Sequence, residues 1–150
     1  MPASSALLCL LLVAACVWAP APRHLSEGLA PWLGGGIAWP VCAGRDRAAR
    51  GVTCIVDGDT FWLSGEKYRL ACVDAVEISE HDGMAARGAL ARLLAAPRAR
   101  LVRSGRSGRY GRDLVRVAGP DWDAAAELVR SGLAQPVDYR STRAFCRTTV

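Results

Sequence analysis

Two stretches of the chain, residues 52–56 and 68–73, are rich in apolar and β-branched residues, and a third, residues 60–63, lies between them. The tripeptide Asp-Gly-Asp at 57–59 and the Ser-Gly-Glu-Lys segment at 64–67 separate the three stretches. Such residues mark turns and do not fit inside a core strand. The pattern predicts three short strands whose ends carry polar residues.

Four carboxylates fall at two of these strand ends, namely Asp57, Asp59, Asp74 and Glu77. Arg69 lies inside the strand that leads to the second end. An inward-pointing arginine in an apolar strand needs a partner, whereas exposure on the polar face of the sheet is the alternative. Carboxylates grouped beside a guanidinium are what a metal and phosphate site needs.

The later part of the chain predicts two helices and two more strands. Residues 82–96 form the first helix, with Asp82 as its N-cap, and its apolar positions are Met84, Ala85, Leu90, Leu93 and Leu94. Residues 98–103 alternate as a half-buried strand, 104–108 form a loop, and 113–118 are the fifth strand. A second helix begins after Asp121 or Asp123 and continues to Arg130, with Gly132 ending it. Its inward positions are Ala126, Leu128 and Val129.

Five short strands interrupted by one helix and followed by another fit a small, partly open barrel with helical cover. The expected fold class is therefore α+β, mainly β: an OB-fold five-stranded barrel with two or three helices. From residue 133 onward the sequence has no clear period.

The N-terminal segment has the pattern of an export signal. Residues 1–21 carry no charged side chain, and the apolar run at 6–19 has the length of a signal-peptide core. Val13-Ala14-Ala15-Cys16 resembles a bacterial lipobox, so a lipid-anchored Cys16 is an alternative, as is an uncleaved anchor. Residues 22–50 are expected to be a Gly- and Pro-rich linker, 51–146 the folded domain and 147–150 a tail.

The 19 Lys and Arg residues all follow residue 21 and exceed the 14 acidic residues, which gives a net charge of +5. Such a charge favours binding to a polyanionic partner. The alternative is a soluble protein that is basic without having such a partner.

Four of the six cysteines lie beyond the signal segment: Cys42, Cys54, Cys72 and Cys146. In an exported protein an even number indicates disulfides, and four cysteines allow three pairings. We expect Cys146 to pair with Cys42 or Cys54. A zinc site is disfavoured because the chain has no CxxC pair.

The grouped residues offer each part that phosphodiester hydrolysis requires. A hard cation with oxygen ligands can polarise the phosphate, two guanidiniums can bind its oxygens, and a carboxylate can activate the water. Asp59 and Asp74 suit the ion, Arg69 and Arg112 the phosphate, and Glu77 the water. Taken singly, each has a simpler interpretation as a tight turn, a solvated loop or a hairpin residue.

Five blocks, in order, resemble the thermonuclease family, the staphylococcal-nuclease-like domains. The blocks are Val-Asp-Gly-Asp-Thr-Phe-Trp at 56–62, Gly-Glu-Lys-Tyr-Arg-Leu at 65–70, Val-Asp-Ala-Val-Glu at 73–77, Arg-Tyr-Gly-Arg at 109–112 and Leu-Val-Arg-Ser-Gly-Leu-Ala at 128–134. The resemblance covers about residues 51–140, and the cysteines at 42, 54 and 146 are similar to those of exported bacterial members. It implies an OB-fold, calcium-dependent nuclease that cleaves DNA and RNA with little sequence preference at the 5′ P–O bond.

The resemblance also implies roles for individual residues. Arg69 and Arg112 match the two catalytic arginines, Glu77 the carboxylate that activates or orients water, and Tyr110 a residue that contacts phosphate or sugar. The family's usual Asp before this last block is Gly108 here, which loosens the loop that presents Arg112.

The same resemblance implies a calcium site. Asp59 and Asp74 match direct calcium ligands, Ala75 would offer its backbone carbonyl, and Asp57 would help through water. The family usually has Pro where this chain has Val76, so the turn before Glu77 lacks a stiffening residue.

Two functions follow as expectations. The first is an exported nuclease for DNA and RNA, favouring single strands, monomeric, and periplasmic, secreted or lipid-anchored. The second is a catalytically weakened nuclease-like domain that binds nucleic acid or a protein partner at the cell envelope. An OB-type module for another ligand, such as an oligosaccharide, is a weaker third possibility.

Overall fold

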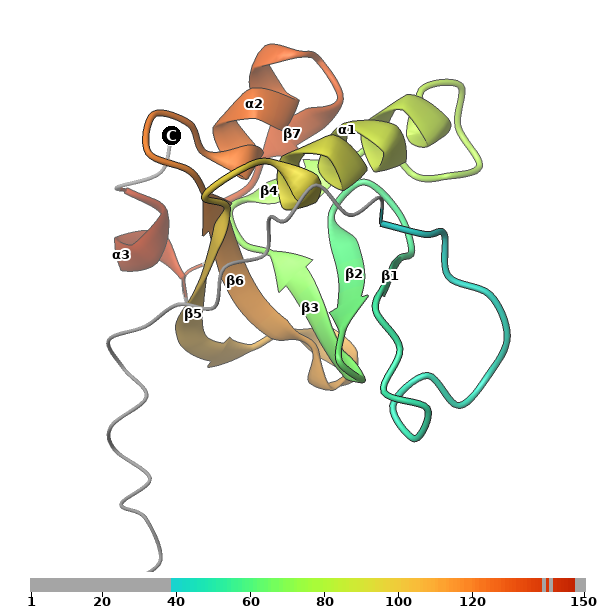
Figure 1. Cartoon of the computed structure of the whole chain (residues 1–150). Coiled ribbons are helices and arrows are strands. Elements are labelled where there is room, and N and C mark those ends of the chain that lie inside the picture. Colours follow the sequence, from blue (N-terminus) through green and yellow to red (C-terminus); the bar gives the residue numbers. More distant parts are fainter. Residues whose placement is uncertain (1–38, 139, 141, 148–150) are drawn as a thin grey trace, which may run out of the picture.

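The structure is a computed structural model and describes residues 39–138, 140 and 142–147. The strands, shown in Figure 1, are β1 (Cys54–Ile55), β2 (Thr60–Leu63), β3 (Glu66–Leu70), β4 (Val73–Ala75), β5 (Arg100–Ser107), β6 (Asp113–Ala118) and β7 (Ala134–Pro136). The helices are α1 (Gly83–Ala95), α2 (Ala124–Arg130) and α3 (Arg143–Cys146), with a 3₁₀ turn, η1, at Arg109–Gly111. The α+β class predicted from the sequence is confirmed.

The main sheet has five strands in the order β1-β2-β3-β6-β5. It is mixed, because β3 and β6 run parallel while the other neighbours are antiparallel. A second sheet pairs β4 with β7. Figure 1 shows α1 and α2 side by side near β4 and β7, and α3 packs on Leu114 of β6.

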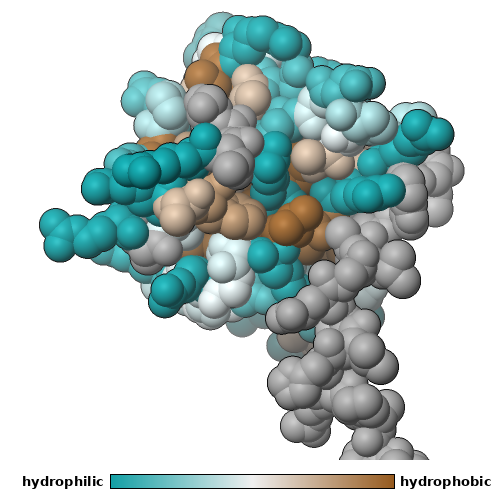
Figure 2. Space-filling model, turned by 90° about the vertical axis from the view of Figure 1, so that its left-hand side faces the viewer, coloured by the Kyte–Doolittle hydropathy of each residue, from teal (hydrophilic) through white to brown (hydrophobic). Residues whose placement is uncertain are grey.

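The core forms where the alternating strand residues meet the apolar faces of the two longer helices. Phe61 stacks on Tyr68 with ring centroids 5.5 Å apart, and Trp39 meets Phe61 edge-on at 5.8 Å. The helices contribute Leu90 and Leu94 from α1 and Leu128 from α2, all fully buried. Figure 2 shows the face on the α3 side, where hydrophilic side chains surround a band of apolar ones.

The predicted strand at 68–73 is interrupted. β3 ends at Leu70, and β4 begins at Val73 in the other sheet. Cys72 between them has a left-handed backbone (φ +73°), which turns the chain out of the first sheet. The turn directs Asp74 and Ala75 into the β4–β7 pair.

The loop predicted at 104–108 is wrong over most of its length. β5 continues to Ser107, which pairs with Asp113 after a register shift. Gly105 takes a left-handed conformation (φ +70°) and allows this bulge. The strand predicted at 113–118 is confirmed as β6.

The first helix is confirmed, but its buried face differs from the prediction. Met84 is 68% exposed and Ala85 is also exposed, whereas Gly83 and Ala86 are buried. The helix turns this face inward because Gly83 lies directly on the backbone at Glu77. Asp82 occupies the N-cap position without a capping hydrogen bond, and its side chain contacts His81 instead.

The second helix is confirmed, with Asp123 as its N-cap. The carboxylate of Asp123 accepts hydrogen bonds from the backbone N–H groups of Ala125 (2.9 Å) and Ala126 (3.1 Å). Of the predicted inward residues Leu128 is fully buried, while Ala126 and Val129 are half-buried. Gly132 follows the helix with φ +71°.

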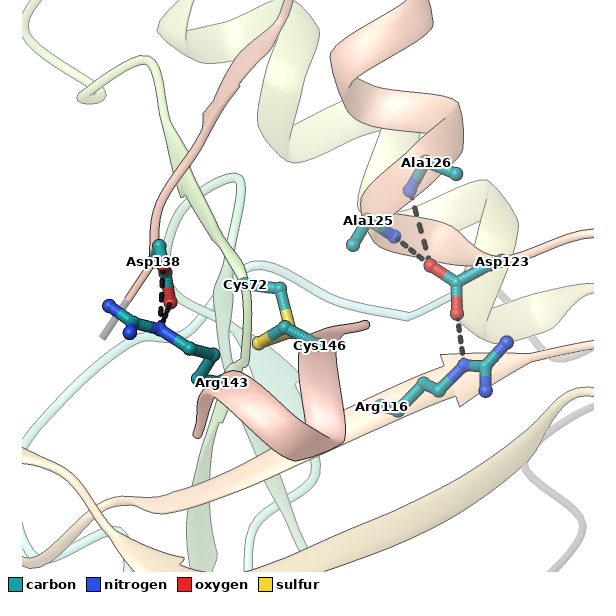
Figure 3. The surroundings of a disulfide bond; sticks show 8 residues. All are labelled: Cys72, Arg116, Asp123, Ala125, Ala126, Asp138, Arg143 and Cys146. Carbon is teal, nitrogen blue, oxygen red and sulfur yellow. Dashed lines mark hydrogen bonds and ion pairs between the residues drawn. A yellow bond between two sulfur atoms is a disulfide. The ribbon is translucent and has the colours of Figure 1, made fainter. Parts of the chain in front are cut away.

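The predicted pairing of Cys146 with Cys42 or Cys54 is wrong. The disulfides are Cys42–Cys54 and Cys72–Cys146, the latter shown in Figure 3. Val41 forms a bridge with Ile55, which places Cys42 beside Cys54. Cys146 lies in α3, which packs on the turn that contains Cys72.

Two disulfides are typical of proteins from oxidising compartments. The folded part begins by Trp39, ahead of the boundary expected at residue 51. The predicted signal segment, Cys16, most of the predicted linker and residues 148–150 lie outside the described residues. In the described part of the chain, no helix has both the length and the apolar character needed to cross a membrane.

Candidate functional site

Asp59 is the buried centre of the candidate site. It ends the turn at 57–59 and is 2% exposed, and its carboxylate accepts three hydrogen bonds and makes one further ion-pair contact. Oδ1 accepts from the Thr60 hydroxyl (2.8 Å) and from Arg69 (2.8 Å). Oδ2 accepts from the Ala75 backbone N–H (3.1 Å) and lies 2.7 Å from Nη2 of Arg69. An ionised carboxylate has about four acceptor positions, so Asp59 is saturated.

Burial raises the pKa of Asp59 to about 7, and the nearby Asp57 carboxylate acts in the same direction. Arg69 and the hydrogen bonds from Thr60 and Ala75 lower it, but less than burial raises it. The ionisation of the Asp59 carboxylate therefore depends on the neighbouring Arg69 guanidinium.

Arg69 is the cation that joins Asp59, just before β2, to Asp74 in β4. Its side chain is only 13% exposed, and Nη2 contacts both Asp59 and Asp74. Asp74 is half-exposed, so this pair opens to solvent on one side. The inward partner that the sequence required for Arg69 is thus a pair of carboxylates.

The position of Asp57 and Asp59 depends on a close contact at Gly58. A Cβ atom at residue 58 would lie 2.7 Å from the Cβ atoms of both Ala75 and Ala86. Glycine therefore allows the turn to lie against β4 and α1 at once. The Asp57 carboxylate accepts the Asp59 backbone N–H at 3.2 Å, which tightens the turn.

Glu77 follows β4 and is exposed. It lines a hollow of about 260 Å³ together with Asp74, Ala75 and residues of β7. A Cβ atom at Gly83 would lie 2.0 Å from the carbonyl oxygen of Glu77, so the first residue of α1 rests directly on the Glu77 backbone. Among the described residues, no side chain pairs with the Glu77 carboxylate.

Arg112 and Tyr110 lie at the start of β6. The Arg112 guanidinium is 5.7 Å from the Tyr110 ring centroid, and its Nε donates to the backbone oxygen of Arg109 (3.0 Å). Leu114, two residues after Arg112, pairs in register with Arg69. Arg112 therefore starts on the same face of the sheet as Arg69, although no described carboxylate pairs with it.

Lys67 is a basic residue that motif reasoning did not single out. It lies two residues before Arg69 and pairs across the strands with Trp62. Burial lowers the pKa of Lys67, and the nearby charge of Arg112 lowers it further, while Asp57 acts in the opposite direction. The charges of Arg112, predicted to bind phosphate, and of Asp57, predicted to belong to the metal site, therefore both act on Lys67. Its spacing of two residues from Arg69 places both side chains on one face of β3, and this spacing could have identified Lys67 from the sequence.

The residues brought together are Asp57, Asp59, Arg69, Asp74 and Ala75, while Glu77 lies beside them on the open side. Across residues 39–138, 140 and 142–147, no group of three or more His, Cys, Asp or Glu side chains converges tightly enough to hold a metal ion. Asp59 and Asp74 nevertheless meet at one positively charged atom of Arg69. Two carboxylates that converge on a single cationic point fit a hard divalent cation, provided that Arg69 gives up its place.

The chain matches no family model, and no curated protein is significantly similar to it.

Proposed function

We propose that this chain is a calcium-dependent, nonspecific nuclease of the staphylococcal-nuclease-like type that hydrolyses phosphodiester bonds of DNA and RNA. The observation that carries the proposal is the guanidinium of Arg69, which contacts the carboxylates of Asp59, just before β2, and Asp74, in β4. A phosphate oxygen and a divalent cation together could replace this arrangement, the anion binding Arg69 and the cation binding the carboxylates.

The strand order supports an OB-type barrel as the scaffold. An OB fold is a partly open, five-stranded Greek-key barrel. Here β3 pairs in parallel with β6. Of the two strands between them in the sequence, β5 lies at the edge of the main sheet and β4 belongs to the second sheet. With β1 at the other edge, closure between β1 and β5 would complete the barrel.

The chain's own residues supply binding and proton transfer. Arg69 and Arg112 start on one face of the sheet and would bind two oxygens of the same phosphate, which holds it against the open side of the site. Glu77 is exposed and beside Asp74, so its carboxylate can take a proton from an attacking water. Calcium, held by Asp59, Asp74 and the Ala75 carbonyl with Asp57 acting through water, would neutralise charge on the phosphate.

The setting fits an exported protein. The net charge of +5 and the two disulfides suit a protein that meets nucleic acid outside the cytoplasm. We place it in the periplasm, outside the cell or on the envelope through Cys16, and as a monomer.

Digestion of single-stranded DNA by the purified protein, with calcium and with chelator, tests the proposal. We expect cleavage only with calcium. Glu77→Gln should lower the rate about 100- to 10,000-fold and Arg112→Ala about 100- to 1,000-fold, with unchanged circular dichroism because both side chains lie outside the core. Full activity of both variants, or equal activity in chelator, would contradict the assignment.

A second candidate is a catalytically weakened domain that only binds nucleic acid or a protein partner at the envelope. Val76 in place of the stiffening proline and the saturation of Asp59 by Arg69 favour it. It predicts salt-sensitive binding of single-stranded DNA by a folded, disulfide-intact protein without any turnover in calcium.

A further inference from the structure

A second pocket, of about 380 Å³, lies where β3 and β6 begin. It shares no lining residue with the hollow beside Asp74 and Glu77. Its size lies within the range of about 300–1,000 Å³ that is typical of small-molecule sites. The side chains that matter for its chemistry are Trp62, Glu66, Lys67, Arg103, Tyr110 and Asp113.

Two aromatic side chains reach this pocket from different elements. Trp62 comes from β2 and is half-buried, whereas Tyr110 is 87% exposed. Tyr110 also has a left-handed backbone (φ 60°, ψ 31°), which costs a residue other than glycine about 1–2 kcal/mol. Packing does not explain why the fold presents a large aromatic ring to solvent in a strained conformation, and strain of this kind clusters at ligand sites.

The two acidic residues of the pocket share one arginine. Arg103 pairs with Glu66 and, at 2.9 Å, with Asp113, and its guanidinium lies 5.2 Å from the Tyr68 ring centroid. Hydrogen bonds from Tyr68 and Arg103 lower the pKa of Glu66, so the pairing is an ionic one. Arg103 offsets only one of the two negative charges, so a phosphate at the pocket needs a further cation.

Lys67 supplies the positive charge that balances the second carboxylate of the pocket. Its ammonium lies 6.0 Å from the Trp62 ring centroid, at the outer limit of a cation–π contact. It makes no ion pair with any described residue. A weakly held ammonium on a flexible stem can move to a phosphate that comes within reach.

The pocket continues the candidate site along one strand. Lys67 and Arg69 are two residues apart on the same face of β3, a spacing of about 6.6 Å. The Arg112 guanidinium lies over the Tyr110 ring. The turn at η1 therefore carries a residue of the pocket next to a residue of the candidate site. A polynucleotide whose phosphate binds Arg69 and Arg112 would bring its neighbouring nucleotide to Lys67 and the two aromatic rings.

We infer that this pocket is a nucleotide subsite, in which Trp62 and Tyr110 stack on a base of single-stranded DNA or RNA and Lys67 binds the adjoining phosphate. The inference rests on the proposed function for its substrate class. Stacking on aromatic rings tolerates any base, so the subsite would add affinity without adding sequence preference.

The test measures binding of the full chain, in chelator, to an oligothymidylate and to an abasic oligonucleotide of the same length. Trp62→Leu should weaken binding of the oligothymidylate about 5- to 150-fold and leave binding of the abasic strand unchanged. Trp62→Phe, which keeps an aromatic face, should retain most of the affinity. Trp122→Leu is the matched control, because Trp122 is also half-buried but packs at Gly119, outside the pocket.

Equal loss for both oligonucleotides, or no loss for either, would overturn the inference. If Trp62→Leu fails to fold by circular dichroism, Tyr110→Ala decides in its place, since removal of an exposed ring leaves the core intact. Cleavage in calcium is scored separately. Base-dependent binding without cleavage removes the nuclease proposal but keeps the subsite, whereas cleavage without base-dependent binding removes the subsite alone.

Discussion

The residues that place the candidate site include two that carry no side chain. Gly58 lets the turn with Asp57 and Asp59 lie against Ala75 and Ala86, and Gly83 lets α1 begin on the Glu77 backbone. Neither has a left-handed backbone, so the requirement is one of space. The position of the predicted catalytic carboxylate is therefore fixed by packing beneath it.

Gly83→Ala should push the Glu77 turn outward, because the new methyl group would lie 2.0 Å from a backbone oxygen. We expect a loss of stability of about 1–3 kcal/mol and, if Glu77 moves by about 1 Å, a rate of DNA cleavage lower on the order of 100-fold. Thermal unfolding and a cleavage assay measure the two effects.

Gly88→Ala is the control for this prediction. Gly88 lies in the same helix, where a Cβ atom would meet only the end of Arg92 at 3.7 Å. This variant should gain about 0.5–1 kcal/mol from helix propensity and keep full activity. A Gly83→Ala protein that behaves like Gly88→Ala would show that the contact at Glu77 does not position the turn.

At the scale of elements, the strand ends could be predicted from the sequence, and the connections between distant segments could not. The turn signal placed Asp59 directly before β2, and Arg69 lies inside β3 as expected, because turn residues and apolar runs are local signals. Asp74, expected at a strand end, lies inside β4 instead. β7 and α3 have three and four residues, too few for a period to appear. Without α3, nothing in the sequence could bring Cys146 to Cys72.

The Cys72–Cys146 disulfide secures the turn that leads into β4. It joins residues 74 apart, whereas Cys42–Cys54 joins residues 12 apart. Loop-closure entropy then predicts that replacing both Cys72 and Cys146 by alanine costs about 4 kcal/mol, against about 3 kcal/mol for the other pair. Denaturant unfolding of the two double variants measures the difference, and a larger loss for the Cys42 and Cys54 pair would contradict the loop-closure account.

At the scale of the whole molecule, the excess of basic residues could be predicted, while its arrangement required the fold. Lys67, Arg69 and Arg112 come from two strands that pair only in the folded sheet, with Lys67 and Arg69 on β3 and Arg112 just before β6. Two strands and a helix lie between β3 and β6 in the sequence, so no local pattern predicts their parallel pairing.

Three phosphate contacts predict how binding to single-stranded DNA depends on salt. The logarithm of the binding constant should fall with the logarithm of salt concentration with a slope of about −2, from about −0.7 for each contact. Lys67→Ala should reduce the slope to about −1.4. Arg130→Ala is the control: it removes an exposed residue paired with Glu127 on α2 and should leave the slope unchanged. A similar change of slope in both variants would mean that only the net charge of the protein matters and that Lys67 makes no specific phosphate contact.

The parallel pairing of β3 with β6 also determines when in its synthesis the chain can acquire a complete site. The two arginines come together only after α1 and β5 have been made and β6 has docked, and long-range pairing of this kind forms late. Arg112 lies in the last third of the sequence and Cys146 near its end. A ribosome-bound or truncated chain that ends before Arg112 would therefore carry the carboxylates and Arg69 but only one of the two arginines. A chain with the proposed activity would be harmless to nucleic acid until most of it has been made.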